Sequence, residues 1–149
     1  MSTNLLTLEG VHTHIGAYHI LHGVDLAVPK GQLTMLLGRN GAGKTTTLRT
    51  VMGLWHASQG RVRFGERDIT ALRTPQIAEL GIAYVPENMG IFSDLTVKEN
   101  MLLAARGAKN AQQMDDTRLQ WIFKLFPAVE KFWNLSLIHI SEPTRLRRI

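Results

Sequence analysis

Apolar and polar residues alternate in the first part of the chain, as they do in half-buried strands. The stretch LLTLEGVHTHI predicts a strand from about Leu5 to Val11. Two shorter strand patterns follow, around Ile20–Leu21 and Val24–Val28, and the turn Pro29-Lys30-Gly31 ends them. Residues 60–70 alternate again, with apolar side chains on one face and arginines on the other. Together these segments predict antiparallel strands.

Two later segments are continuously apolar and predict a different kind of strand. The run QLTMLLG occupies residues 32–38 and ends in glycine, and the run IAYVP occupies residues 82–86. Neither run alternates, so each is typical of a strand that is buried on both faces of a sheet.

One helix is predicted directly after the first apolar run. Leu48, Val51 and Met52 recur at helical spacing and share one face of this helix. Gly53 follows them as a stop signal.

Three more helices are predicted further along the chain. Residues 74–81 form a short one, with Thr74 as its N-cap. Thr96 and Glu99 form a Thr-x-x-Glu capping box at the start of an apolar helix. Residues 117–126 carry apolar side chains at helical spacing. The whole pattern predicts an α/β protein whose helical part is an insertion or a subdomain.

Composition narrows the class of protein. With 149 residues, 44% of them apolar and 19% charged, the chain resembles a soluble globular domain or part of one. It has no cysteine, which excludes disulfides and thiolate metal sites. No run approaches the roughly 18 apolar residues of a membrane-spanning helix, and the N-terminus lacks a signal-peptide pattern. We therefore expect a cytoplasmic location, with any membrane link made through a partner.

The net charge of +5 and the isoelectric point of about 10.0 suggest an anionic partner. Residues 135–149 contribute +2 of this charge, from three arginines and one glutamate, and the other residues carry +3. The basic character therefore depends heavily on the C-terminal segment. One arginine cluster without interleaved aromatic residues is weak support for nucleic-acid binding, and we expect no nucleic-acid partner.

The segment GRNGAGKT fits the pattern Gly-x-x-x-x-Gly-Lys-Thr, with a predicted buried strand before it and a predicted helix after it. Glycines let backbone amides converge on phosphate oxygens, and the following helix presents its positive end. Lys44 suits the β- and γ-phosphates, and the Thr45 hydroxyl suits Mg²⁺. The expected phosphate-binding residues are Gly38, Arg39, Asn40, Gly41, Ala42, Gly43, Lys44, Thr45 and Thr46.

The extended segment GRNGAGKTTTLRTVMGL resembles the Walker A segment of ATP-binding cassette (ABC) ATPases. The stretch GVDLAVPKGQLTMLLG resembles the strand and turn that lead into Walker A in that family. The stretch GIAYVPENMGIFSDLTVKEN resembles the segment that carries the family's Q-loop and its Thr-Val-x-Glu-Asn helix start. The resemblance covers about Leu5 to Asn134.

The resemblance implies a P-loop NTPase fold with an ABC-type core, an N-terminal antiparallel β-subdomain and the start of a helical subdomain. It also implies that the protein binds ATP and Mg²⁺ and forms a head-to-tail dimer with a second ABC ATPase subunit. ATP hydrolysis would then drive transmembrane permease subunits, which hold the protein at the inner face of the membrane. Val-Pro-Glu at residues 85–87 is common in cassettes of branched-chain amino acid importers, so import of these or related solutes is expected.

Glu87 occupies the Q-loop position, where most members of the family carry glutamine. The family role of this position is to sense Mg²⁺ and the attacking water and to couple the site to the membrane subunit. Because Mg²⁺ prefers oxygen ligands, we expect both Thr45 and Glu87 to bind it. A surface glutamate after a strand is the alternative. No other metal is expected, since the six histidines, His12 and His14 among them, show no metal-ligand spacing.

The expected adenine contact departs from the family pattern. The family usually stacks adenine on a tyrosine in a Tyr-Gly pair about 23 residues before the first Walker A glycine. The pair at this position is Ile15-Gly16. Ile15 can pack its apolar surface on the base, and Tyr18 or His14 can take the place of the tyrosine. We expect adenine contacts at Ile15 and Tyr18 with weaker base selectivity, although Tyr18 also suits an ordinary strand position.

Other parts of the family's site have no counterpart in the sequence. These are the Leu-Ser-Gly-Gly-Gln signature loop, the Asp and Glu of the Walker B strand, and a later histidine. By family spacing the signature loop begins near Asn134, and only its Leu-Ser is present there. Without a general base, we expect the chain to bind ATP but not to hydrolyse it at a meaningful rate.

The segment SLIHISEPTR resembles the translation of sequencing-adapter DNA. We therefore expect residues 1–134 to be a truncated ABC ATPase domain and residues 135–149 to be a non-native tail. A native short isoform and a basic tail for nucleic acid or lipid are the alternatives.

Two other functions stay open at this point. One is a nucleotide-binding module without catalysis, such as a short regulatory subunit. The other is a P-loop protein that acts on nucleic acid, which predicts salt-dependent DNA binding without residues 135–149.

Overall fold

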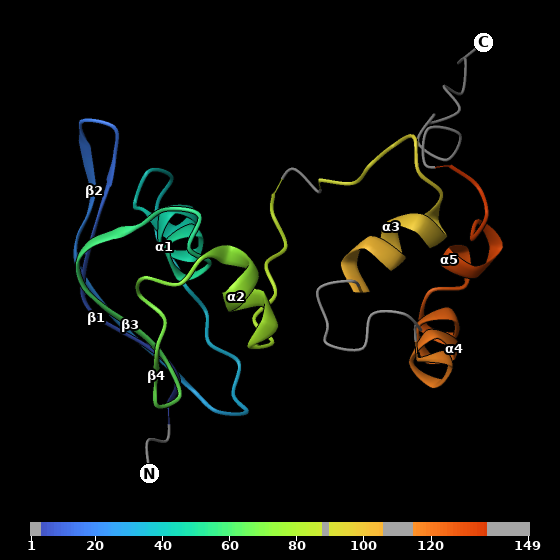
Figure 1. Cartoon of the computed structure of the whole chain (residues 1–149), viewed down its shortest axis with the longest axis horizontal. Helices are drawn as coiled ribbons and strands as arrows, with labels where there is room; N and C mark the ends of the chain where they lie inside the picture. Colours follow the sequence, from blue (N-terminus) through green and yellow to red (C-terminus); the bar gives the residue numbers. More distant parts are fainter. Residues whose placement is uncertain (1–3, 88–89, 106–114, 137–149) are drawn as a thin grey trace. The chain divides into compact units, whose positions relative to one another are not determined.

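The computed structural model describes residues 4–87, 90–105 and 115–136. The chain divides into two compact units, residues 1–84 and residues 85–149. The first contains β1 (Asn4–Ile15), β2 (Tyr18–Pro29), α1 (Lys44–Val51), β3 (Ala57–Phe64), β4 (Arg67–Asp68) and α2 (Thr74–Glu79) (Figure 1). The second contains α3 (Val97–Ala105), α4 (Asp116–Leu125) and α5 (Pro127–Lys131).

The strands of the first unit form one antiparallel sheet, as predicted, and their order is β2-β1-β3-β4. The strands differ from the sequence-based expectation mainly in length. β1 continues to Ile15 because it stays paired with β2 up to Tyr18. The two short patterns of residues 20–28 are parts of the single strand β2, whose register with β1 shifts at several points. Residues 57–68 form two strands, β3 and β4, rather than one.

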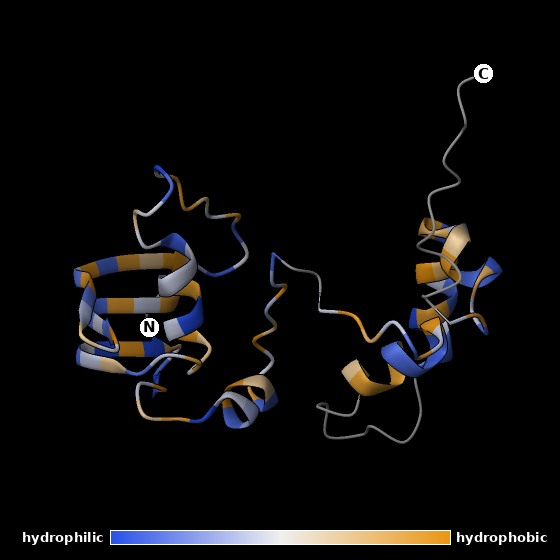
Figure 2. Cartoon of the chain, turned by 90° about the horizontal axis from the view of Figure 1, so that it is seen from above, coloured by the Kyte–Doolittle hydropathy of each residue, from blue (hydrophilic) through white to orange (hydrophobic). Residues whose placement is uncertain are grey.

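The apolar core of the first unit lies on one face of this sheet. Strand alternation, seen as alternating orange and blue along the strands in Figure 2, sends every second side chain of β1 and β3 to that face. The core consists of Leu8, Val11, Leu21, Val51, Val62 and Ile69. Five of these six come from or directly follow a strand, and Val51 comes from α1. The sheet and α1 are therefore joined through a shared core.

The predicted inward face of α1 is confirmed at Val51 and at Met52, the C-cap, which are each 6% exposed, but not at Leu48. Thr47, Thr50 and Val51 are its buried residues, whereas Leu48 is 46% exposed. A buried hydrogen bond between the hydroxyls of Thr50 and Thr13 fixes this orientation, because it turns the threonine side of the helix toward β1. Leu48 lies two residues away, about 200° around the helix, and so faces outward.

The start of α2 also differs slightly from the prediction. Arg73, not Thr74, is the N-cap, and Thr74 is the first residue of the helix. The Gln76 side chain accepts a hydrogen bond from the Arg73 backbone N–H at 2.9 Å. Gly81 has φ of +92° just beyond the helix, so it serves as the predicted stop.

The two continuous apolar runs were predicted to be buried strands, and this prediction was wrong. Residues 32–38 and 82–86 form neither helix nor strand, and Figure 2 shows orange apolar positions along these irregular segments. Leu33 is 92% exposed and Val85 is 86% exposed. A strand that is buried on both faces needs paired neighbours along its edges. Among the described residues, no strand pairs with either run.

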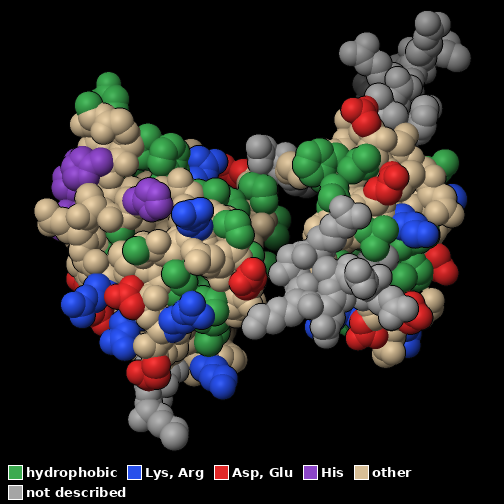
Figure 3. All heavy atoms as spheres, viewed as in Figure 1, with side chains coloured by type: hydrophobic (Ala, Val, Ile, Leu, Met, Phe, Trp, Pro, Cys, Tyr) green, Lys and Arg blue, Asp and Glu red, His purple; other side chains and the backbone are tan. Residues whose placement is uncertain are grey.

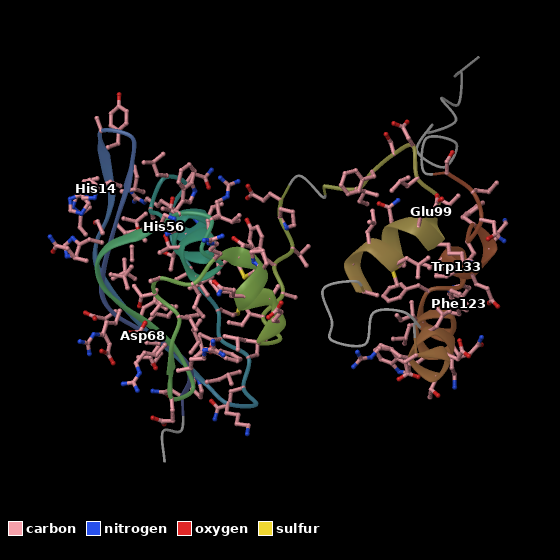
Figure 4. The ribbon with its side chains drawn as sticks, in the orientation of Figure 1. His14, His56, Asp68, Glu99, Phe123 and Trp133 are labelled. Atoms are coloured by element: carbon pink, nitrogen blue, oxygen red, sulfur yellow. The ribbon has the colours of Figure 1, made fainter. Side chains whose placement is uncertain are left out.

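The second unit is helical, as predicted. Phe123 of α4 is buried and packs edge-on against Trp133, with ring centroids 5.0 Å apart (Figure 4). The backbone carbonyls of Trp133 and Leu135 accept hydrogen bonds from the N–H groups of Lys98 and Val97 at the start of α3. The chain from α5 to Leu135 thus caps α3. The expected non-native tail lies mostly outside the described residues, which end at Ser136, so the boundary at residue 134 stays a prediction.

Candidate nucleotide-binding site

The predicted phosphate loop leads directly into α1. Gly43 is the N-cap of this helix, with φ of +86°, and Gly41 has φ of +85°. Both values lie in the left-handed region, which side chains disfavour, so the loop requires glycine at these two positions. The motif's spacing therefore reflects the backbone path, which turns sharply twice before α1 begins.

Lys44 folds back over the loop that precedes it. Its Nζ donates hydrogen bonds to the backbone carbonyls of Gly38, at 2.7 Å, and Arg39, at 2.8 Å. The loop therefore closes around a cationic group at the point where α1 begins. A positive charge at that place favours an anionic ligand.

The N-terminus of α1 lacks the side-chain caps of the other long helices. Glycine at the N-cap offers no side-chain acceptor, and the first turn carries no acidic residue. By contrast, Asp115 accepts hydrogen bonds from Thr117 and Arg118 at the start of α4. The first amides of a helix carry a partial positive charge that an acceptor normally satisfies. This helix end is therefore suited to accept an anion, as phosphate loops do.

The phosphate loop and α1 are attached to the sheet at Leu21 and Thr13, and a further hydrogen bond joins the loop to α1. A Cβ on Gly43 would lie 2.8 Å from Cδ2 of Leu21 on β2, so glycine lets the loop approach that strand closely. One turn further along, Thr47 donates a hydrogen bond to the Gly43 carbonyl at 2.9 Å. The Thr13–Thr50 hydrogen bond then joins α1 to β1. The sheet thereby holds the start of α1 in place.

Sequence reasoning missed these supporting residues. Leu21 and Thr13 lie far from the loop in sequence and give no local signal for their role. The threonines of α1 do give one, since Thr47 and Thr50 recur three residues apart, which places them on one helix face. The apolar pattern identified Val51 and Met52, which are buried, but it placed Leu48 with them instead of the two threonines.

Ile15 and Tyr18, the expected adenine contacts, pair across the tip of the β1–β2 hairpin. Thr13 and Leu21, which pair further down the hairpin, contact α1 and the phosphate loop. Residues at alternate positions of β1 share a face, so Ile15 lies on the same face as Thr13. Tyr18 is 75% exposed and Ile15 is partly buried. Contact with a base stays a prediction for both.

Glu87 is exposed and lies in a turn of the second unit, whereas the phosphate loop belongs to the first. Its predicted role at Mg²⁺ therefore stays a prediction. Within the described part of the chain, no group of three or more His, Asp or Glu side chains is arranged to hold a metal ion.

The Thr-Val-Lys-Glu-Asn segment of the second unit forms a network of hydrogen bonds. The Glu99 carboxylate accepts from the N–H and the hydroxyl of Thr96, both at 2.8 Å, and the Glu99 N–H donates to the Thr96 hydroxyl. This confirms the predicted capping box, and Figure 4 labels Glu99 in the first turn of α3. The hydrogen bonds from the Thr96 backbone and hydroxyl lower the pKa of Glu99 below its ordinary value.

Asn100 holds the loop before α3. Its side-chain oxygen accepts from the Phe92 N–H at 3.0 Å, and its amide donates to the carbonyls of Phe92, Leu95 and Thr96. One side chain thus satisfies four backbone groups. The asparagine of this segment has a structural reason to be present, which the sequence alone did not reveal.

A comparison with protein families identifies the fold. A family model described as ABC transporter matches residues 21–140, which includes the phosphate loop, α1 and the capping box. The chain belongs to the ABC transporter family. The described residues contain the antiparallel sheet, the phosphate loop and the helices of an ABC-type P-loop fold, in agreement with the sequence-based expectation.

Relatives of this ABC protein include ATP-binding proteins that are named for the transport of different solutes. The chain is 35% identical over 127 residues to a high-affinity branched-chain amino acid transport ATP-binding protein from Pseudomonas aeruginosa. The aligned residues make up 85% of this chain and 54% of that relative. The chain is also 34% identical over 121 residues to a ribose import ATP-binding protein from Rhizobium etli. The aligned residues make up 80% of this chain and 24% of that relative.

Solved structures of ABC proteins resemble this chain in fold. The structure of an ATP-binding subunit of an ABC transporter aligns with a TM-score of 0.75 and 25% sequence identity, over 92% of this chain and 56% of that one. The chain thus spans about half the length of the first curated relative and of this solved structure. Among the described residues, no helix is long and apolar enough to cross a membrane.

Proposed function

We propose that this chain provides the ATP-binding half-site of an ABC importer's ATP-binding subunit. The observation that carries the proposal is the start of α1, where an uncapped helix end meets the Lys44 ammonium within a loop that requires glycine. A nucleotide's β- and γ-phosphates would occupy this end of the helix. Lys44 would then exchange its hydrogen bonds with the Gly38 and Arg39 carbonyls for bonds to phosphate oxygens.

The same loop supplies an oxygen ligand for Mg²⁺. Thr45 follows Lys44 in the first turn of α1, and a hydroxyl at this position fits a hard cation that prefers oxygen. We propose Glu87, at the Q-loop position, as a second ligand. Bound Mg²⁺ would neutralise phosphate charge, while the protein's own part is to position the phosphates with the loop amides and Lys44.

The base of the nucleotide would lie against the hairpin tip. The tip carries Ile15 and Tyr18 on the sheet face that also contacts the phosphate loop through Leu21. Isoleucine offers apolar contact but no aromatic stacking, so Tyr18 would supply the aromatic surface. We therefore expect modest selectivity for adenine over other bases.

The complete subunit would dimerise head to tail with a second ABC ATPase subunit and couple hydrolysis to permease subunits at the inner face of the membrane. Branched-chain amino acids are the first candidate cargo, because of Val-Pro-Glu at residues 85–87 and the relative in Pseudomonas aeruginosa. The relative named for ribose import supports a broader class of importer. We expect residues 1–149 alone to bind ATP and not to turn it over, since the sequence carries no Walker B pair.

Equilibrium binding of MgATP to residues 1–149, followed by calorimetry, tests this proposal. Lys44→Ala should weaken binding by at least about tenfold, since hydrogen bonds to charged groups contribute about 1.5–3 kcal/mol. Lys30→Ala is the matched control, because Lys30 is exposed in the turn after β2 and outside the loop. It should bind as the unchanged chain does.

Unchanged affinity in the Lys44→Ala chain, with an unchanged circular dichroism spectrum, would contradict the proposed phosphate site. Equal weakening in both lysine variants would indicate a non-specific electrostatic effect instead. Steady-state ATP turnover by the unchanged chain that disappears in Lys44→Ala would contradict the expected lack of catalysis while preserving the binding site.

A further inference from the structure

Four of the six histidines lie together on the β1–β2 hairpin, on the face opposite the core. His12 and His14 belong to β1, and they pair across the hairpin with His22 and His19 of β2. The ring of His19 stacks on that of His14 at 4.2 Å, and it lies 3.8 Å from that of His22 and 5.1 Å from that of His12. The purple side chains at the left of Figure 3 mark this histidine cluster.

A hydrogen bond within the histidine cluster limits how many protons it can hold. Nδ1 of His12 and Nε2 of His19 are 3.0 Å apart, so one ring donates and the other accepts. A protonated imidazole donates from both nitrogens and cannot accept. Because the bond needs one neutral partner, double protonation of His12 and His19 breaks it and places two like charges in contact.

The surroundings of His19 also disfavour the protonated form of its ring. Partial removal from water, and then the charges of His22, His14 and His12, lower the pKa of His19 below its ordinary value of 6.5. A hydrogen bond with the Leu21 backbone acts in the opposite direction and raises the pKa of His19. The His14 ring is held in place separately, because its Nδ1 is hydrogen bonded to Oγ of Ser58 on β3.

Few acidic groups on this face can offset added protons. By strand alternation the outer face also carries Glu9 of β1, Asp25 of β2 and Arg61 of β3. Arg61 lies opposite Glu9, and Asp25 accepts a hydrogen bond from the Gly10 N–H at 2.7 Å. The electrostatic influences on His19 come from histidines and from no carboxylate. Protonation of the histidine cluster therefore adds repulsion across the hairpin.

We propose that the histidine cluster makes the β1–β2 hairpin sensitive to protons, so that it is closed near pH 7 and loosens as acidification to about pH 5 charges the rings. Metal binding is not the better explanation, since no group of three or more such side chains among the described residues is arranged to hold a metal ion. The loosening would reach the phosphate loop, because Leu21 on the inner face of the same hairpin contacts Gly43.

The direction of the effect follows from proton linkage. A histidine whose pKa is lowered by folding binds fewer protons in the folded chain than in the unfolded chain. The folded state is therefore fully stable above the ordinary histidine pKa and loses stability as the pH falls below it. For each unit by which folding lowers a ring's pKa, the opening equilibrium of the hairpin shifts by about tenfold at low pH.

The direct test is a proton NMR titration of the histidine rings in residues 1–149, with the urea-unfolded chain as reference. We expect His19 to titrate below its value in urea. His56 is exposed and lies outside the cluster, so its resonance serves as the internal reference. The protection factors of the backbone amides at residues 12–22, which correct for the slower intrinsic exchange at low pH, should fall on acidification. These readouts follow the hairpin alone and do not depend on nucleotide binding.

His19→Gln and His56→Gln form the matched pair of variants. His19→Gln removes the ring that contacts the other three, so the thermal midpoint should fall less between about pH 7 and about pH 5 than in the unchanged chain. His56→Gln should retain the full fall. Equal pH dependence in both variants, or titration of all cluster histidines at their values in urea, would overturn the proposal.

Discussion

The hydroxyl groups of Thr13 and Thr50 are hydrogen bonded at 3.1 Å in the buried space between β1 and α1. Thr13 is 0% exposed and Thr50 is 5% exposed. Each hydroxyl therefore depends on the other for a partner away from water. This bond ties the helix of the phosphate loop to the hairpin that carries the proposed base contacts.

Replacement of either threonine by valine should destabilise the first unit. The remaining hydroxyl would stay buried without its partner, which costs about 1–3 kcal/mol. The double variant should recover much of that loss, because both polar groups are then removed together. Urea unfolding of the four chains measures the coupling. Strictly additive losses would show that the two hydroxyls do not depend on each other.

Gly43→Ala should destabilise the chain more than Gly41→Ala. Both glycines have a left-handed backbone, which costs a side chain about 1–2 kcal/mol. Only at Gly43 would the new Cβ also meet Leu21, at 2.8 Å, whereas at Gly41 it meets nothing within 4 Å. The difference in thermal midpoint isolates the contact between loop and strand. Equal midpoints would mean that Leu21 moves aside without cost.

Asn100→Ala should loosen the loop of residues 92–96 in the second unit. The variant removes one acceptor and two amide donors that serve the backbone of that loop. A loss of about 1–3 kcal/mol in local stability is expected. Amide exchange in residues 92–100 measures it, and Asn134→Ala, in an exposed turn, is the control. Unchanged protection at Phe92 would contradict the proposed role of Asn100.

Acidification should weaken the start of α3 through Glu99. The pKa of Glu99 is lowered in the folded chain, so its carboxylate stabilises the fold above its ordinary pKa of about 4.5. That contribution is lost as the pH falls through the lowered value. Glu99→Gln retains an acceptor for the Thr96 N–H but cannot titrate, so helicity of α3 should become independent of pH in this range.

Carbon NMR titration of the side-chain carboxyls would measure the effect directly. Glu130→Gln, at an exposed position of α5, should retain the acid-induced weakening of α3. A Glu99 carboxyl that titrates as in the unfolded chain would be inconsistent with the capping box as the cause.

Local chemistry made several features of this protein predictable. The left-handed positions of the phosphate loop need glycine, and the Thr96–Glu99 box satisfies a helix end within four residues, so both are visible in short stretches of sequence. The antiparallel sheet was also predictable, because alternation directly reports a strand with one buried face. The turn that ends β2 at Pro29 was predicted too, whereas the bulges were not, so residues 20–28 were not recognised as parts of one strand.

Features that depend on distant partners could not be predicted in the same way. The runs at residues 32–38 and 82–86 have the composition of buried strands, yet a strand exists only where another strand pairs with it. The histidine cluster gave no signal in sequence spacing, because the register of β1 and β2 brings its rings together.

The sequence by itself therefore determined the phosphate loop, the Thr96–Glu99 capping box and the family of this protein, since each rests on residues that are neighbours along the chain. Tertiary structure decided that Thr50 and not Leu48 faces the sheet, through the bond from Thr50 to Thr13, and how closely the loop approaches β2 at Leu21. It also decided that four histidines share one surface. These relationships join residues that are far apart in sequence, and only the paired strands set the distances between them.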